Sequence, residues 1–143
     1  MEVMFTPFRL PTGNPRFMRL YCCLGPLKQG FRDGCRPIIG FDGCHLKGTY
    51  PGQLLTALGV DPNNGYWPIA WAVVEKEATE QWTWFLKLLS EDLEIENQYH
   101  YTFIFDQQKV MHYNYCRCLC NLIFVIKTNI YFFFLYYRDW IEH

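Results

Sequence analysis

Two aspartates stand beside apolar runs that have the composition of β-strands. Asp42 interrupts an apolar run within residues 36–46, and Asp106 directly follows residues 101–105. A carboxylate in a buried strand is costly unless it is paired or binds a metal ion. Taken singly, each aspartate is therefore either a structural acid whose charge is compensated or a metal ligand.

The pattern around the first aspartate predicts an antiparallel meander. Residues 36–46, 53–60 and 66–74 are rich in the apolar and β-branched residues that strands prefer. Short turns separate these segments, and Asn64-Gly65 is a residue pair that favours positive φ in tight hairpins. Three strands joined by short turns form a meander in which neighbours run antiparallel.

A helix is predicted before the second aspartate. Residues 79–93 repeat apolar side chains with helical spacing. The apolar face consists of Trp82, Phe85, Leu86, Leu89 and Leu93. A helix at this place permits a crossover, so strand 101–105 can lie parallel to strand 36–46.

If those two strands are neighbours, Asp42 and Asp106 meet at one edge of the sheet. Two adjacent carboxylates repel each other, and a bound divalent cation relieves that repulsion. Oxygen ligands with partial hydration suit Mg²⁺ or Mn²⁺. Considering both acids together therefore favours a metal site over two separate structural acids.

Composition limits the class of protein. The chain has 143 residues, of which 50% are hydrophobic, and a formal net charge of -1. It is long enough for one domain with a real core, and it does not have the composition of a disordered chain. Seven cysteines, and a start without the apolar run of a signal peptide, predict free thiols in a reducing compartment. The cluster Cys116-Arg-Cys-Leu-Cys120 lacks the CxxC spacing usual for zinc.

The first third of the chain is less clearly patterned. Residues 1–18 are rich in proline, and we expect a poorly ordered segment there. Residues 19–35 are interpreted as a short helix or loop that leads into the first strand. Gly25-Pro26 interrupts the near-helical spacing of their leucines.

Five motifs of this chain, in order, resemble the catalytic domain of plant Mutator-like element (MULE) transposases. They are GCRPIIGFDGCHLKG (34–48), GQLLTALG (52–59), PIAWAVVE (68–75), WTWFL (82–86) and FIFDQQK (103–109). The resemblance implies an α/β, ribonuclease H-like fold with three antiparallel strands, a helix and a fourth strand parallel to the first. It also implies a DDE site in which Asp42 and Asp106 are the first and second catalytic acids and bind Mg²⁺ or Mn²⁺.

By the same resemblance, the chemistry is metal-dependent cleavage and strand transfer of DNA, with transposon ends and target DNA as partners. Two divalent ions held by the acids would activate a water or a DNA 3′-hydroxyl for attack on a phosphodiester. The resemblance implies a nuclear location and allows self-association. Arg36 and Lys47 could contact phosphates, but no catalytic role is assigned to them.

The chain departs from the family pattern near the second acid. The family usually has serine before that acid and Arg-Gln-Lys-Gly after it, whereas this chain has Phe105 and then Gln107-Gln-Lys-Val110. Beyond Lys109 we recognise no further motif. The third acid, a glutamate on a later helix, is missing, and no motif supports Asp139 or Glu142 in its place. We therefore predict a fragment that is truncated before the final helices and is inactive alone.

This interpretation divides the chain into a poorly ordered segment 1–18, a partial transposase domain 19–110, and a non-homologous hydrophobic tail 111–143. The tail has the character of translated intron or out-of-frame sequence. Residues 119–137 have about the length of a membrane span. Lys127 lies inside that run, and a central lysine costs about 2.5–3.5 kcal/mol on insertion, which argues against a span.

Three alternatives to the transposase fragment remain open from the sequence, and the weakest is an unrelated ribonuclease H-like nuclease. The other two are not enzymes. One is a domesticated, transposase-derived regulator that associates with DNA and does not cleave it. The other is a small protein with a C-terminal membrane segment. The retention of Asp42 and Asp106 speaks against the regulator, because a non-catalytic module need not keep them.

Overall fold

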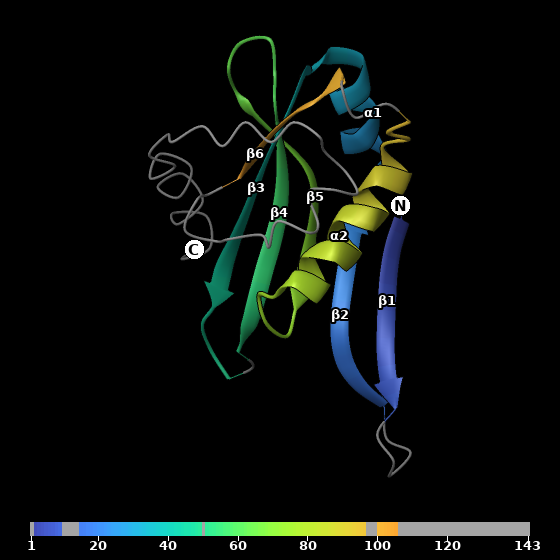
Figure 1. The fold of residues 1–143 in the computed structure, drawn as a ribbon, viewed down its shortest axis with the longest axis vertical. Coiled ribbons are helices and arrows are strands. Elements are labelled where there is room, and N and C mark those ends of the chain that lie inside the picture. The colour runs from blue at the N-terminus through green and yellow to red at the C-terminus, as the bar shows by residue number, and fades with distance from the viewer. Residues whose placement is uncertain (1, 10–14, 50, 97–99, 106–143) are drawn as a thin grey trace.

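The structure, a computed structural model, describes residues 2–9, 15–49, 51–96 and 100–105. These residues form one mixed sheet of six strands and two helices (Figure 1). The elements are β1 (Glu2–Arg9), β2 (Pro15–Cys23), α1 (Gly25–Gly34), β3 (Arg36–Leu46), β4 (Gly52–Val60), β5 (Tyr66–Val74), α2 (Thr79–Asp92) and β6 (Thr102–Phe105). The strand order is β1-β2-β5-β4-β3-β6, so β3, which carries Asp42, lies next to the edge strand β6.

The predicted meander is confirmed. Strands β3, β4 and β5 pair antiparallel in sequence order. The β4–β5 turn has Asn64 at φ 67°, the left-handed conformation that its Asn-Gly pair favours. Asp61 stabilises the turn because its Oδ1 accepts hydrogen bonds from the backbone N–H of Asn63, at 2.8 Å, and Gly65, at 2.7 Å.

The parallel neighbour of β3 is confirmed too. Strand β6 pairs parallel with β3, and the register runs from Ile38 opposite Thr102 to Phe41 opposite Phe105. Helix α2 provides the crossover that a parallel connection requires. The Phe41 and Phe105 rings stack, with their centroids 4.7 Å apart, and so fix this register by side-chain packing.

The N-terminal residues differ from the prediction of a poorly ordered segment. Residues 2–9 form β1, which pairs antiparallel with β2 over its whole length. Pro7 lacks a backbone N–H, but β1 is an edge strand, and the register shifts between Thr6 and Pro7. Edge strands and irregular positions are where a sheet tolerates proline, so the prolines do not prevent strand formation here.

Residues 19–35 are part strand and part helix. Residues 19–23 complete β2, which pairs with β5. Helix α1 then begins at Gly25, with Pro26 in its first turn. Proline is favoured at the start of a helix because its missing N–H has no intrahelical partner there. Gly25-Pro26 therefore starts the helix and does not interrupt it.

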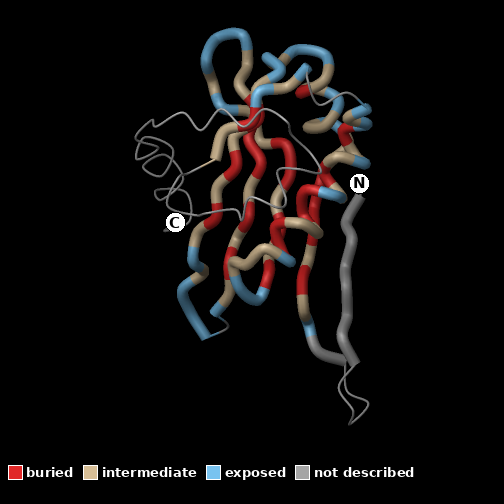
Figure 2. The backbone as a smooth tube through the Cα atoms, in the orientation of Figure 1, coloured by how far each residue is buried: buried red, intermediate tan, exposed pale blue. Residues whose placement is uncertain are grey.

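Both helices pack on one face of the sheet. From α2, Trp82 contacts Phe41 of β3 edge-to-face, with centroids 6.4 Å apart, and Phe85 contacts Tyr21 of β2 at 5.8 Å. From α1, the buried Phe31 lies over Gly59 of β4. Figure 2 shows the resulting alternation, in which buried positions recur along the central strands.

Gly59 tests the packing of α1 on the sheet. A Cβ atom at Gly59 would lie 2.6 Å from Cδ2 of Phe31, whose side chain is only 2% exposed. Overpacking a filled core typically costs about 1–3 kcal/mol, so we expect Gly59→Ala to lower the free energy of unfolding by that amount in denaturant titrations. Gly34→Ala is the matched control, because a Cβ there meets nothing within 4 Å. Equal stability of the two variants would contradict this packing.

Candidate active site

Asp42 is a half-buried residue in the middle of β3. Its Oδ1 accepts a hydrogen bond from the backbone N–H of Gly43, at 2.8 Å, and its carbonyl oxygen accepts one from Thr56 Oγ1, at 3.3 Å. The first contact orients the carboxylate, and the second ties the aspartate's backbone to β4. The candidate acid is thus held on a strand, not on a mobile loop.

Strand alternation places Asp42 on the face of the sheet opposite the helices. Phe41 and Gly43 point to the helix-covered side, and successive strand residues point to opposite faces. Register pairing extends the face of Asp42 across four strands. We call this surface the Asp42 face, made of Leu20, Cys22, Asp42, Cys44, Leu54, Thr56, Trp71 and Val73.

Asp106 lies outside the described residues. The described part of β6 ends at Phe105, which is opposite Phe41 in register. The structure therefore places Phe41 and Phe105, the residues directly before the two predicted acids, side by side. Within the described ranges, no group of three or more His, Cys, Asp or Glu residues could hold a metal ion. Asp42 is thus the one predicted acid whose position can be described.

Sequence reasoning did not single out a second carboxylate near β3. Glu77 packs over Gly43 on the helix-covered side, where a Cβ would lie 3.0 Å from its Oε1. That oxygen accepts a hydrogen bond from Trp82 Nε1 at 3.2 Å. The sequence feature that corresponds to this contact is Gly43, directly after Asp42, because a residue without a side chain leaves room for Glu77 to pack against the strand. Because strand β3 separates Glu77 from the Asp42 face, we interpret Glu77 as structural.

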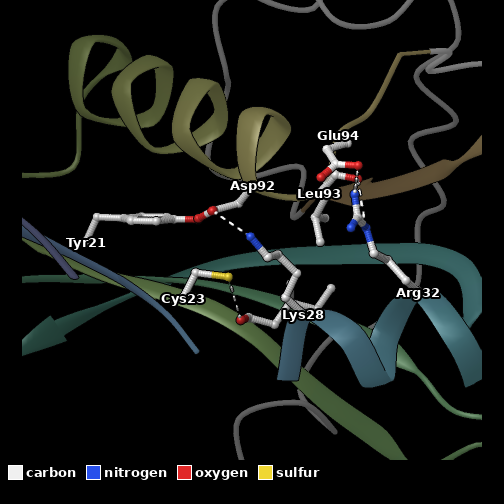
Figure 3. A network of polar contacts seen from close by, with 8 residues as sticks. Tyr21, Cys23, Lys28, Arg32, Asp92, Leu93 and Glu94 are labelled. Carbon is white, nitrogen blue, oxygen red and sulfur yellow. Dashed lines mark hydrogen bonds and ion pairs between the residues drawn. The ribbon is translucent and has the colours of Figure 1, made fainter. Parts of the chain in front are cut away.

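A second polar cluster joins α1, α2 and β2 on the helix-covered side (Figure 3). Tyr21 Oη donates a hydrogen bond to Asp92 Oδ2 at 2.7 Å, and Lys28 Nζ donates to Asp92 Oδ1 at 3.1 Å. Burial, and then the charge of Asp92, raise the pKa of the Cys23 thiol to about 11. Cys23 is therefore protonated at neutral pH and is not an activated nucleophile. The cluster stabilises the packing of the helices.

The same side carries an ion-pair network at the start of α2. Arg19, only 7% exposed, pairs with Glu75 at 3.3 Å and with Glu80 at 2.9 Å, and lies over the ring of Trp84. Partial burial by itself raises the pKa of Glu75. Hydrogen bonds from its own backbone and from Gln81, together with the Arg19 charge, outweigh burial and hold that pKa below its usual value.

Other residues considered from the sequence are placed as follows. Arg36 donates a hydrogen bond to the Pro62 carbonyl oxygen at 3.1 Å, and Lys47 is exposed just beyond β3. Asp139, Glu142, the cluster 116–120 and the run 119–137 lie outside the described residues. Neither of the two described helices is long and apolar enough to cross a membrane.

Comparison with known families decides the relationship. The sequence profile of the MULE transposase domain matches residues 38–122, which is more than half of the chain. The chain belongs to the MULE transposase domain family. Searches among curated proteins and among solved structures returned no match.

The MULE match covers the part of the sheet that carries the candidate site. It begins in β3 shortly before Asp42, includes β4, β5, α2 and β6, and continues to residue 122. The expectation that the family resemblance stops at Lys109 is therefore wrong. The motif-by-motif comparison missed the last part because this chain departs from the family pattern just after Asp106.

Acid unfolding tests the Arg19 network. A carboxyl with a lowered folded pKa contributes stability above its ordinary pKa of 4.5, and this contribution is lost as the pH falls through the folded value. We expect Glu75→Gln to cost about 0.5–1 kcal/mol near pH 7, a small figure because solvent screens this partly exposed pair. Its stability should also fall less steeply than that of wild type below pH 4.5.

The control for this experiment is Glu91→Gln, which changes an exposed glutamate of α2. Chemical denaturation at a series of pH values measures both variants. An acid dependence of Glu75→Gln identical to that of wild type would contradict a stabilising role for the Glu75 charge.

Proposed function

We propose that this MULE domain has a ribonuclease H-like fold and a DDE-type site, in which Asp42 and Asp106 are the first two catalytic acids. The observation that carries the proposal is the parallel register of β3 and β6. Phe41 lies opposite Phe105, and each of these residues directly precedes one of the acids. A continuation of that register by one residue would set the two carboxylates next to each other.

The proposed cofactor is Mg²⁺ or Mn²⁺. Asp42 offers a half-buried carboxylate, a hard oxygen ligand of the kind these ions prefer. Asp106 would supply the second carboxylate. When bound, the ion would stabilise the charge that develops on phosphate oxygens during displacement at a phosphodiester. Gly43 N–H orients the Asp42 carboxylate, and Thr56 holds the backbone behind it.

We further propose that the chain is a fragment of a transposase and does not cleave DNA alone. After Asp106 the sequence contains only two acidic residues, Asp139 and Glu142. Both lie beyond residue 122, where the family match ends. The matched domain therefore offers no third acid after Asp106. In an active assembly, the partners would be transposon ends and target DNA, the location would be the nucleus, and another chain would supply the missing group.

Metal binding is the first test. We expect calorimetric titration of the full chain with Mn²⁺ to show a site whose affinity falls at least about tenfold in Asp42→Asn and in Asp106→Asn, because each change removes a charged ligand. Asp33→Asn is the matched control, since Asp33 is an exposed acid of α1. Unchanged Mn²⁺ affinity in Asp42→Asn would refute the assignment.

Strand cleavage is the second test. The purified chain, incubated with duplex DNA and Mg²⁺ or Mn²⁺, should produce no nicks, because two acids do not complete the site. Metal-dependent nicking that disappears in Asp42→Ala would overturn the proposed inactivity while supporting the role of the acid. Gel analysis of a labelled duplex distinguishes these results.

The absence of a further acid between Asp106 and residue 122 also favours a second candidate function. A transposase-derived regulator would use the domain to associate with DNA without cutting it. Sequence-specific DNA retention that needs no Mg²⁺ and survives Asp42→Asn would support this candidate. Retention that requires both the metal and Asp42 would support the transposase fragment instead.

A further inference from the structure

The two ends of the sheet differ in the elements that they carry (Figure 1). We call the end at which β3 terminates the carboxyl end, because the parallel strands β3 and β6 both run toward it. The residues after β3 and the connection from β5 to α2 lie there. Strand β2 pairs with β5 only from Leu20 to Cys23, so its first residues and the end of β1 extend past β5 at this end. Helix α1 and the β4–β5 turn lie at the opposite end.

The two ends also differ in charge. At the carboxyl end the basic residues outnumber the acidic ones, whereas at the opposite end the acidic residues are in excess. The carboxyl end has Arg9, Arg16, Arg19, Lys47 and Lys76 against Glu75, Glu77 and Glu80. The opposite end has Lys28, Arg32 and Arg36 against Asp33, Asp61, Glu91, Asp92, Glu94 and Glu96. The potential therefore changes sign along the strand direction.

The basic residues of the opposite end are engaged within the protein. Lys28 pairs with Asp92 at 3.1 Å, and Arg32 pairs with Glu94 at 2.7 Å. Arg36 donates a hydrogen bond to the Pro62 carbonyl oxygen. Arg36, which the sequence offered as a phosphate contact, therefore lies at the acidic end and is unsuited to that role.

At the carboxyl end it is the glutamates that are engaged. Glu75 and Glu80 pair with Arg19, and Glu77 accepts a hydrogen bond from Trp82. Lys47 and Lys76 are exposed, one directly after β3 and the other two residues after β5. Strands β3 and β5 are two strand spacings apart, or about 10 Å. The two lysines therefore present a pair of positive charges on one end of the sheet.

We propose that the carboxyl end binds the phosphate backbone of duplex DNA through Lys47 and Lys76. Lysine side chains on a locally basic surface attract phosphates irrespective of base sequence. The N-terminus of α2 lies at the same end, and its dipole adds to the positive potential. The proposal takes the identity of the partner from the proposed function, and it names the surface on which that partner lies.

The position of this surface fits the candidate acid. Lys47 follows Asp42 by five residues of extended chain, which span about 17 Å. That length corresponds to about five base pairs of duplex at about 3.4 Å each. A duplex with a phosphodiester at Asp42 can therefore reach the carboxyl end with its backbone. Binding at this surface requires neither a metal ion nor cleavage.

The salt dependence of DNA binding tests the proposal. The full chain is titrated into a labelled duplex of about 20 base pairs, in EDTA, from about 50 to 200 mM NaCl. In Lys47→Gln combined with Lys76→Gln, the slope of log K against log salt should become smaller in magnitude by about two, because each lost phosphate contact removes about 0.9. The affinity at about 100 mM NaCl should fall at least about tenfold.

The matched control is Arg36→Gln combined with Lys87→Gln, which removes the same charge from two exposed residues elsewhere. Its slope should stay within about half a unit of the wild-type value. Equal losses in both pairs, unchanged binding in the lysine pair, or no binding by the wild-type chain would overturn the proposal. Weaker DNA binding in the lysine pair, with Mn²⁺ affinity unchanged in Asp42→Asn, would support this surface while refuting the metal assignment.

Lysine footprinting tests the same surface in the unaltered chain. Acetylation with an activated ester is followed by mass spectrometry, with and without the duplex. DNA should slow the modification of Lys47 and Lys76 at least about threefold, while Lys87, exposed on α2, keeps its rate. Equal protection of all three lysines, or protection of Lys87 alone, would count against binding at the carboxyl end.

Discussion

The parallel pairing of β3 with β6 is the constraint on which the rest of the account depends. Asp42 is 64 positions before Asp106 in the sequence, and this pairing sets the residues directly before them, Phe41 and Phe105, opposite each other. The pairing requires a crossover, which α2 supplies, and it is held by the stacked rings of Phe41 and Phe105. The candidate site therefore depends on aromatic packing one residue away from each acid.

The sheet separates the charged side chains that tie helices to strands from the carboxylate of Asp42. On the helix-covered side, the charges of Arg19, Asp92 and Glu77 have partners that tie helices to strands. On the other side, the Asp42 face carries a single carboxylate among apolar residues. A buried carboxylate is costly unless it is compensated. Asp42 is half-buried, and its Oδ1 accepts a hydrogen bond from Gly43 N–H; under the proposed function, a cation shared with Asp106 would add to that compensation.

The sequence was sufficient to predict elements that depend on local signals. The meander followed from apolar runs separated by short turns and from the Asn64-Gly65 pair, in which Asn64 adopts positive φ. The parallel position of β6 followed from the helix between strands. The first hairpin could not be predicted, because Pro7 is acceptable only at an edge and the edge is a property of the whole sheet. Glu77 was missed since its contact with Gly43 is tertiary.

The most direct test of the paired acids is nuclear magnetic resonance of the full chain with trace Mn²⁺, which broadens signals close to the ion. The account predicts that backbone amides of residues 40–44 and 104–107 broaden first, while those around Asp92 persist. Broadening centred on the acids of α2, or spread evenly over the exposed carboxylates, would contradict a metal site built from Asp42 and Asp106.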